Sequence, residues 1–365
     1  MTFTAVETGF MARALKLAVK GMYTTDPNPR VGCVIVKGGT VVGEGWHARA
    51  GQAHAEVLAL AQAGDRARDA DVYVTLEPCN HHGRTPPCTD ALLRAGVRRV
   101  VCAMQDPNPL NDGKGSERLR TAGIDVRSGL LKDQAQSLNP GFISRLRRGR
   151  PFARVKVGAS LDGRTASAGG ESRWITSDAA RTDVQRMRAR SSAVVTGVGT
   201  VLTDDPSLTV RAWDIGRQPL RVVLDSHLRM PPSARMLREP GRTLIATASS
   251  DSLRAQALTT AGAEIARLPA IGGRVDLAQL MPFLAKFDVN EVLVEAGARV
   301  AGAFLSAGLV DELVVYLAPA LLGDGGSGMF HLPEVRTLAN RFELQVTDLR
   351  AVGSDWRVTA KVNEK

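Results

Sequence analysis

The sequence has few cysteines, few aromatic residues and no long apolar run, and each shortage excludes a class of protein. Four cysteines in 365 residues are too few for a disulfide framework. Aromatic residues make up only 4%, but hydrophobic residues reach 44%, as in ordinary globular chains. No apolar run approaches the length that spans a bilayer, and the acidic residue Glu7 argues against a signal peptide. We therefore expect a soluble, reduced, cytoplasmic protein with no membrane partner.

Acidic residues are outnumbered by basic ones, and the formal net charge is +10. A basic excess can indicate nucleic-acid binding, but such surfaces normally come from clustered Lys and Arg. Here the arginines are scattered, and the densest run is "RLRRGR" at 145–150. We therefore expect a diffuse surface charge, or a site for small anionic substrates, and no nucleic-acid partner.

The length favours two domains, and strand-like and helix-like patterns alternate along the chain, which predicts an α/β fold with helices covering both faces of each sheet. A basic segment with Gly and Pro at 146–151 marks the boundary, which divides the chain into domains 1–146 and 147–365. In the first domain we expect helices near 8–20, 55–64 and 88–95, and strands at 31–36, 40–47, 71–76 and 98–104.

The second domain shows the same alternation with different motifs and no internal repeat. A helix over 177–190 is expected to begin at the N-cap Ser177, and Gly353 lies at the turn of a closing hairpin. A strand is expected at 152–160, buried strands at 222–225, 243–248, 291–297 and 312–319, and further helices at 275–287 and 298–308.

Metal-binding residue types concentrate in the first domain. "HAE" places His54 and Glu56 at the start of a predicted helix, and "PCNHHGRTPPC" supplies Cys79 and Cys88. One imidazole and two thiolates form a three-ligand zinc site with one open position, whereas a structural zinc site needs a fourth protein ligand. Zinc lowers the pKa of a bound water, and a nearby carboxylate that does not bind the metal can move its proton.

The segment "NHHGRTPP" between the two cysteines distinguishes this site from nucleobase deaminases, whose cysteines are two residues apart. We expect its His81 and His82 to line the substrate entrance or face solvent, although a role as extra ligands stays open. Cys33 and Cys102 lie within apolar strand patterns and are expected to be core thiols.

The second domain has no complete dinucleotide fingerprint, because Leu202 stands where the third glycine of "GVGTVL" would be. The turn at Gly297, between a strand and a helix, is a better cradle for a pyrophosphate, although it could be a simple tight turn. Lys156 alternates with Val155 and Val157 on a predicted strand. It is either a functional amine or an edge residue that reaches solvent.

Taken together, "HAE", "LEPCNHHGRTPPC", "DPNPRVGCVIV", "ESRWITSDAAR" and "VEAGARVAGAFL" resemble the bifunctional riboflavin-biosynthesis deaminase/reductase family over nearly the whole chain. The resemblance implies an N-terminal cytidine-deaminase-like α/β/α sandwich and a C-terminal dihydrofolate-reductase-like α/β domain. It also implies one zinc ion on His54, Cys79 and Cys88, with Glu56 as proton shuttle. Asn28 either contacts the pyrimidine or ribose or is a turn residue, and Asn80 departs from a more usual Ser.

For the reductase half, the resemblance implies Lys156 and Glu295 beside the reducible carbon and NADPH as cofactor. The turn Ala298–Arg299–Val300 departs from a more usual Pro-Thr-Leu. The implied substrate contacts are Ser172, Arg188, Leu208, Arg211 and Glu295. The implied NADPH contacts are Gly158, Trp174, Thr200, Asp204, Ser226, Gly297, Ala298, Arg299, Val300, Ala301, Gly302 and Ala303.

The expected function is zinc-dependent hydrolytic deamination of 2,5-diamino-6-(5-phosphoribosylamino)pyrimidin-4-one, followed by NADPH-dependent reduction of the ribosyl side chain to ribityl. The expected partners are this small phosphorylated pyrimidine and further copies of the chain, as a dimer or tetramer. One alternative is a nucleoside or tRNA deaminase with an accessory α/β domain. Another is a nucleic-acid-binding protein that uses the net charge of +10.

Overall fold

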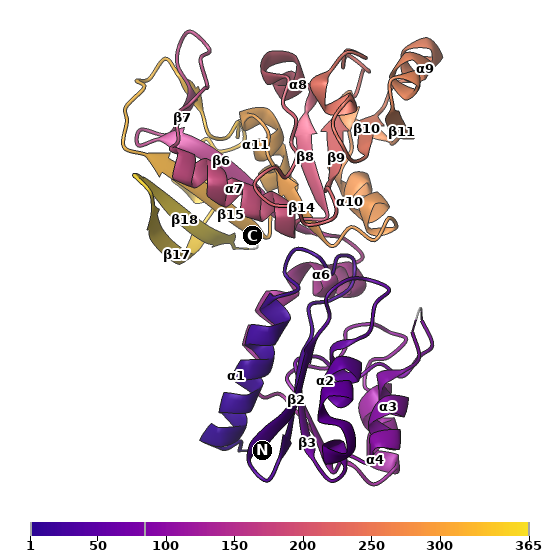
Figure 1. Cartoon of the computed structure of the whole chain (residues 1–365). Coiled ribbons are helices and arrows are strands. Elements are labelled where there is room, and N and C mark those ends of the chain that lie inside the picture. The colour runs from indigo at the N-terminus through magenta and orange to yellow at the C-terminus, as the bar shows by residue number, and fades with distance from the viewer. Residues whose placement is uncertain (1, 84, 364–365) are drawn as a thin grey trace. The chain divides into compact units, whose positions relative to one another are not determined.

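The computed structural model describes residues 2–83 and 85–363, which form two compact units. The first unit ends at Gly149 and the second begins at Arg150. Each unit has its own sheet and its own core, and both have the mixed α/β composition that the alternating pattern predicts (Figure 1).

The first unit is built on a five-stranded sheet of order β2-β1-β3-β4-β5. β1 runs antiparallel to both of its neighbours, whereas β3, β4 and β5 are parallel. The loops that follow β3 and β4 therefore leave the same edge of the sheet, where ligands of α/β proteins commonly bind. The strands are β1 (Gly32–Lys37), β2 (Thr40–Trp46), β3 (Asp71–Val74), β4 (Arg99–Cys102) and β5 (Asp125–Ser128).

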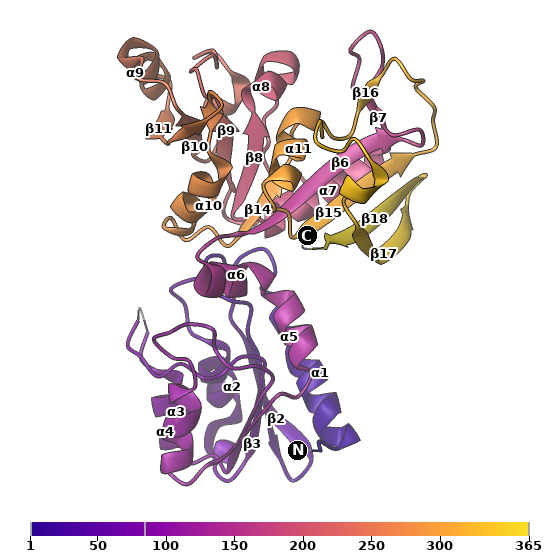
Figure 2. The same cartoon turned by 180° about the vertical axis from the view of Figure 1, so that it is seen from behind.

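Two glycines let helices pack closely on opposite faces of this sheet. A Cβ on Gly32 would lie 2.0 Å from the carbonyl oxygen of Ala14 in α1 (Ala5–Val19), and one on Gly45 would lie 2.3 Å from that of Ala55 in α2 (Ala55–Ala63). Gly45 pairs with Cys33, the neighbour of Gly32, so the two contacts are on opposite faces. The remaining helical segments are η1 (Gly64–Ala67), α3 (Cys88–Ala95), α4 (Lys114–Thr121), α5 (Lys132–Leu138) and α6 (Pro140–Arg148) (Figure 2).

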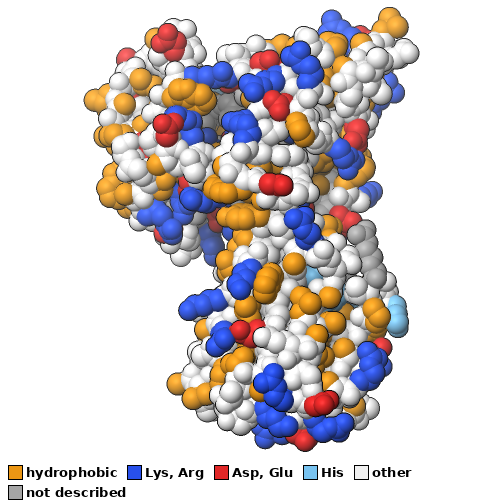
Figure 3. Space-filling model, viewed as in Figure 1, with side chains coloured by type: hydrophobic (Ala, Val, Ile, Leu, Met, Phe, Trp, Pro, Cys, Tyr) orange, Lys and Arg blue, Asp and Glu red, His pale blue; other side chains and the backbone are white. Residues whose placement is uncertain are grey.

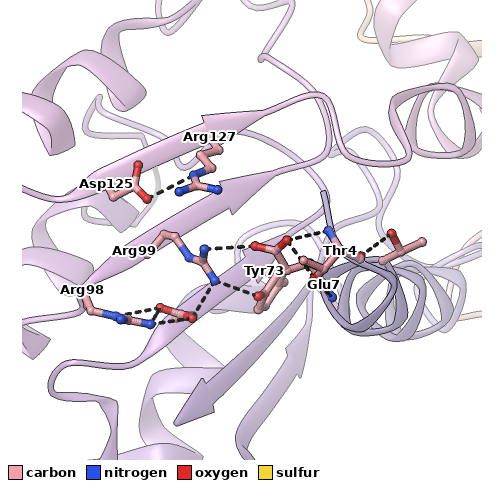
Figure 4. A network of polar contacts seen from close by, with 9 residues as sticks. Thr4, Glu7, Tyr73, Arg98, Arg99, Asp125 and Arg127 are labelled. Atoms are coloured by element: carbon pink, nitrogen blue, oxygen red, sulfur yellow. Dashed lines mark hydrogen bonds and ion pairs between the residues drawn. The ribbon is translucent and has the colours of Figure 1, made fainter. Parts of the chain in front are cut away.

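An ion network ties α1 to the opposite edge of the sheet, where β3 and β4 begin (Figure 4). Arg99 contacts Glu7 of α1 at 3.0 Å, Asp71 at 2.8 Å and the hydroxyl of Tyr73 at 3.3 Å. Glu7 also completes a capping box with Thr4, which explains why the helix begins at Ala5 rather than near residue 8. Because the network lies where β3 and β4 begin, it does not occupy the carboxyl ends of these strands.

The second unit has a nine-stranded sheet within its described residues, of order β11-β10-β9-β8-β14-β6-β15-β18-β17. All pairings are parallel except those of β18. The predicted strand over 152–160 and the predicted hairpin around Gly353 are confirmed. The strands are β6 (Phe152–Ser160), β8 (Ala193–Gly197), β9 (Leu220–Leu224), β10 (Thr243–Thr247), β11 (Ala263–Arg267), β14 (Glu291–Val294), β15 (Glu312–Ala318), β17 (Leu344–Val352) and β18 (Asp355–Val362).

Alternate residues of the central strands pack into two separate cores. Val195 and Val292 belong to the core that contains α10 (Leu277–Ala285) and α11 (Ala298–Ser306), whereas their neighbours Val194 and Leu293 belong to the other core. This period of two is typical of a sheet covered on both faces. The second core includes side chains of α7 (Asp178–Arg190), α8 (Val198–Asp204) and α9 (Ser252–Thr260). Ser177 caps α7 as predicted, its hydroxyl accepting the N–H of Ala180.

Several short elements have no clear signal in the sequence, because too few residues are available to show a period. They are β7 (Arg164–Ala166), β12 (Ala270–Ile271), β13 (Arg274–Val275), β16 (Ser327–Gly328), η2 (Arg235–Leu237) and η3 (Leu338–Asn340).

On the face that Figure 3 shows, charge is spread rather than gathered in one place. Lys and Arg side chains are interspersed with acidic and hydrophobic ones over the face that Figure 3 shows. Within the described part of the chain, no helix combines the length and the apolarity that a membrane crossing requires.

Candidate active sites

His54, Cys79 and Cys88 meet at the carboxyl edge of the first sheet. His54 is the N-cap of α2, Cys79 lies in the loop after β3, and Cys88 is the first residue of α3. The Nδ1 atom of His54 lies 3.2 Å from Sγ of Cys88 and 3.6 Å from Sγ of Cys79. Three segments of the chain thus present one ligand atom each.

The three ligand atoms fit a zinc ion. They all lie within 4.8 Å of one another. Zinc–sulfur and zinc–nitrogen bonds of tetrahedral geometry would separate imidazole nitrogen and thiolate sulfur by about 3.6 Å. The imidazole Nε2 faces the hydroxyl of Thr85 at 3.4 Å, a contact of the kind that orients metal-binding histidines.

The two thiols differ in acidity before any metal is considered. A hydrogen bond with Cys88 is the largest cause that lowers the pKa of Cys79 to about 4, and hydrogen bonding to His54 lowers it further. The same contact with Cys79, followed by burial, raises the pKa of Cys88 well above its ordinary value. A metal cation would stabilise both thiolates together, as zinc does.

Glu56 lies in the first turn of α2, two residues beyond His54, and its side chain is buried with only 3% exposed. Burial raises the pKa of its carboxyl to about 7, and the charge of Cys79 adds to this effect. The group can therefore both accept and release a proton near neutral pH, which is the requirement for a general acid and base.

Polar residues that the sequence did not single out support the cysteine loop. The buried carboxylate of Glu77 accepts backbone N–H groups of Asp106, Gly113 and Ser116 at 2.8 to 3.1 Å. Asn111 accepts the N–H of Asn80 at 2.9 Å and donates to the carbonyl oxygen of Pro78. The unusually polar segment at 111–123 is the only signal in the sequence for this arrangement.

Two further polar side chains approach the same site. The Nδ2 atom of Asn28 lies 3.0 Å from Nε2 of His47, and the ring of His47 stands edge-on to that of His54 at 5.2 Å between centroids. Burial lowers the pKa of His47, which favours its neutral form. His81 also has a buried Nδ1 with no hydrogen-bond partner among the described residues.

In the second unit, strand register brings Lys156 and Glu295 to the same level. Val155 of β6 pairs with Val294 of β14, and Lys156 and Glu295 each directly follow one member of this pair. Lys156 and Gly158 lie on the half-buried face of β6, while Val155 and Val157 are buried. Burial lowers the pKa of the Lys156 ammonium, and the charge of Glu295 opposes that change.

Arg188 of α7 completes the cluster. Its Nε and Nη2 atoms lie 2.5 and 2.9 Å from the two oxygens of Glu295. Burial would raise the pKa of Glu295, but the charge and hydrogen bonds of Arg188 hold it below its ordinary value. The sequence-predicted residues Lys156, Arg188 and Glu295 are thus neighbours, although no short motif contains all three.

The turn at Gly297 begins α11, where backbone N–H groups are available to a phosphate. Gly297 and Arg299 are exposed, whereas Ala301 and Gly302 are buried. A Cβ on Gly302 would lie 2.1 Å from the carbonyl oxygen of His331, so this residue serves packing. The first turn of α11 is therefore the part that can meet a cofactor.

Further predicted residues lie in the segment before α7 and on α8. Ser172 lies 3.4 Å from Asp204, and Trp174, with 70% of its surface exposed, lies 4.5 Å from the guanidinium of Arg181. Thr200 lies on α8.

Leu208 and Arg211 differ in accessibility. The side chain of Leu208 is buried in the core, which leaves its backbone as the part that could reach a substrate. Arg211 is exposed. Partial burial of its guanidinium is the largest cause that lowers its pKa; the charge of Arg188 lowers the pKa further, and the charge of Glu295 raises it.

Two family models match the chain, one within each of the two units. Residues 5–104 match the cytidine and deoxycytidylate deaminase zinc-binding region. Residues 151–358 match the RibD C-terminal domain.

Similarity to known proteins extends over both units. The riboflavin biosynthesis protein RibD of Escherichia coli is 52% identical over 361 residues, covering 95% of this chain and 96% of that protein. The RibD structure from Acinetobacter baumannii, form 1, superposes with a TM-score of 0.91 at 44% identity, covering 98% and 99% of the two chains.

A Thermotoga maritima structure, described as a diaminohydroxyphosphoribosylaminopyrimidine deaminase/5-amino-6-(5-phosphoribosylamino)uracil reductase, has a TM-score of 0.87 at 34% identity, again covering 98% and 99%. These relatives and the two family models bear out the resemblance read from the sequence motifs. The chain therefore belongs to the RibD family of riboflavin-biosynthesis proteins.

Proposed function

We propose that this chain performs both reactions of its family, deaminating a diaminopyrimidine ribotide in the first unit and reducing the ribosyl side chain of the product in the second. It is a zinc- and NADPH-dependent enzyme. The observation that carries the proposal is that one chain contains both a His54–Cys79–Cys88 cluster beside a buried Glu56 and a Lys156–Arg188–Glu295 cluster. The deaminase is assigned to residues 1–146 and the reductase to 147–365, supported by the division between Gly149 and Arg150.

In the first reaction, His54, Cys79 and Cys88 would hold zinc, which supplies a Lewis acid that makes water nucleophilic near neutral pH. Glu56 accepts a proton from the attacking water and delivers it to the pyrimidine ring nitrogen. It then transfers the second proton of the same water to the departing amine, which leaves as ammonia. Burial of Glu56 disfavours its charged form, so the carboxyl is suited to taking up a proton and passing it on.

In the second reaction, NADPH supplies a hydride to C1 of the ribosyl group. Opening the sugar also requires one proton at the ring oxygen, and the Lys156 ammonium on the half-buried face of β6 is the group placed to provide it near Glu295. Glu295, held by two hydrogen bonds from Arg188, would position the substrate beside that ammonium. Arg211 offers a further guanidinium for the 5-phosphate of the ribose.

The direct test is to incubate the purified protein with zinc and the diaminopyrimidine ribotide, with and without NADPH. Ammonia release should not require NADPH, and NADPH oxidation should follow when the cofactor is added. Pretreatment with a zinc chelator should abolish ammonia release but leave reduction of the deaminated substrate. NADPH oxidation with the unreacted substrate, before any ammonia release, would contradict the proposed order.

The proposal includes a cytoplasmic location and a homo-oligomeric state. All four cysteines are free thiols, and Cys33 and Cys102 are buried in core strands, as expected in a reducing compartment. The outer hairpin of the second sheet exposes Val346, Leu349 and Trp356 by 51 to 60%, and exposed apolar side chains on an edge strand favour self-association. Light scattering on the purified protein would distinguish a monomer from a dimer or tetramer.

A further inference from the structure

We propose that Arg229 and Arg254 bind the 2′-phosphate of NADPH beside Ser226 and thereby select NADPH over NADH. The inference rests on the proposed function, since it requires a dinucleotide at the carboxyl edge of the second sheet. It assigns the choice between the two nicotinamide cofactors to residues for which the sequence shows no pattern.

The order and direction of the strands place Ser226 at a suitable distance from the pyrophosphate turn. β14, β8 and β9 are adjacent and parallel, so the turn at Gly297 and the residues after β9 lie on the same edge. Two strand spacings separate them, which is about 10 Å. A pyrophosphate at the first turn of α11 therefore leaves the adenosine half of the cofactor within reach of Ser226.

Ser226 is held rigidly at this edge. Its hydroxyl oxygen accepts the N–H of Val275 at 3.0 Å, and its backbone carbonyl accepts the N–H of Ala248 at 3.3 Å. The hydroxyl hydrogen remains able to donate to an anionic oxygen. The side chain thus offers a fixed donor next to the end of β10.

Two exposed arginines belong to the loop that carries Ser226 and to the helix that contacts this loop: Arg229 is three residues beyond Ser226, and Arg254 lies in α9. Nη1 of Arg254 in α9 donates to the carbonyl oxygen of Leu228 at 3.2 Å, which holds the side chain against the loop that carries Arg229. Nε of Arg254 faces Asp251 at 3.6 Å, and Nη2 has no hydrogen-bond partner within the described chain. Arg229 is exposed and forms no ion pair with any described residue. Guanidinium groups of this kind bind phosphate through charge-assisted hydrogen bonds.

The acidic residue that follows β9 is not accessible to a ligand. In NAD-binding sites, an Asp or Glu at the end of a strand binds the ribose 2′-hydroxyl, and its charge disfavours a 2′-phosphate. Asp225 occupies such a position, but it is fully buried and its Oδ2 accepts the N–H of Met230 at 2.7 Å. The carboxylate is therefore enclosed in its own loop, and the basic side chains are the ones that face outwards.

The test uses the full chain with Arg229→Gln, Arg254→Gln and the double variant. Arg242→Gln is the matched control, because Arg242 precedes the opposite end of β10 and pairs with Glu264 on the surface. Binding of NADP⁺ and NAD⁺ is measured by isothermal titration calorimetry, and 2′,5′-ADP and ADP serve as probes of the adenosine half alone. Circular dichroism establishes that each variant is folded.

Each single substitution should raise the Kd for NADP⁺ and 2′,5′-ADP about tenfold, as expected for loss of a charged hydrogen bond. The Kd for NAD⁺ and ADP should change by less than about twofold, and Arg229→Lys should retain part of the preference because it keeps the charge. Equal weakening of both nucleotides, or unchanged NADP⁺ binding in the double variant, would overturn the assignment. Failure of the unmodified chain to bind NADP⁺ would instead contradict the proposed function.

Discussion

The cluster around His54 and the cluster around Glu295 both lie at the carboxyl edges of sheets, yet they balance charge in different ways. In the first, Cys79, Cys88 and Glu56 crowd acidic groups together, and His54 is the single basic side chain among them. In the second, Glu295 is already paired with Arg188 and lies near Lys156. The first site is therefore built for a cation from outside the chain, whereas the second is balanced by its own side chains.

Glu56→Gln should separate the two sites most sharply. It removes the proton carrier but none of the three candidate ligands, so deamination should fall by about 10² to 10⁴-fold or more. Reduction of already deaminated substrate should be unchanged. Ammonia release and NADPH oxidation measure the two activities, and metal analysis checks that zinc is retained.

The matched control for that variant is Glu117→Gln on the surface of α4 in the same unit. It removes a carboxylate of the same kind and should leave both activities intact. Equal loss of both reactions in folded, zinc-loaded Glu56→Gln protein would show that the two sites do not act separately.

Lys156→Ala should give the opposite result. Loss of the ammonium beside Glu295 removes the proton donor, and hydride transfer should fall by about 10²-fold or more while deamination is retained. Single-turnover oxidation of NADPH is the measurement, with Lys361→Ala on β18 as the control. Normal hydride transfer in the Lys156 variant would remove this residue from the reductase site.

Glu295→Gln tests whether the second cluster is balanced internally. It leaves Arg188 without its charge partner, and breaking a buried pair in this way costs about 3 to 5 kcal/mol. Urea unfolding should therefore show a destabilised second unit and an unchanged first unit. Zinc chelation of the unmodified protein should produce the reverse pattern, and the same response to both treatments would contradict the comparison.

The pH dependence of this effect has a defined sign. The pKa of Glu295 in the folded protein lies below its ordinary value, because Arg188 outweighs the effect of burial. Its contribution to stability is therefore present above the ordinary glutamate pKa and is lost as the pH falls through the lower folded value. This acid-dependent loss should be absent from Glu295→Gln.

Glu7→Gln should have the smallest effect, because it acts at the edge of the first sheet opposite to the metal ligands. It weakens the capping box with Thr4 and the ion pair with Arg99, but Arg99 keeps its ion pair with Asp71 and is not left unpaired, so the loss should be only about 1 kcal/mol. The midpoint of urea unfolding of the first unit should decrease slightly. The KM for deamination should stay the same, and a large change in KM would show that the two edges are coupled.

Several features could be predicted because their signals are local. The alternation of Lys156 with Val155 and Val157 identified β6, and Ser177 identified the start of α7. The spacing of "HAE" and the two cysteines indicated a three-ligand zinc site, because the ligand types themselves carry the chemistry. The support that Glu77 gives to three backbone N–H groups could not be predicted, since a lone glutamate after a strand has no distinctive pattern.

The sequence by itself determined the local elements, the candidate ligands and, through its motifs, the family. Only the tertiary structure decided which distant residues meet. Lys156, Arg188 and Glu295 come together because β6 and β14 are neighbours in a particular register and α7 packs beside them. Likewise, the meeting of Arg254 with the loop after β9 depends on strand order. Periodicity shows which face of a strand is buried, but pairing and register are set by packing of the whole sheet.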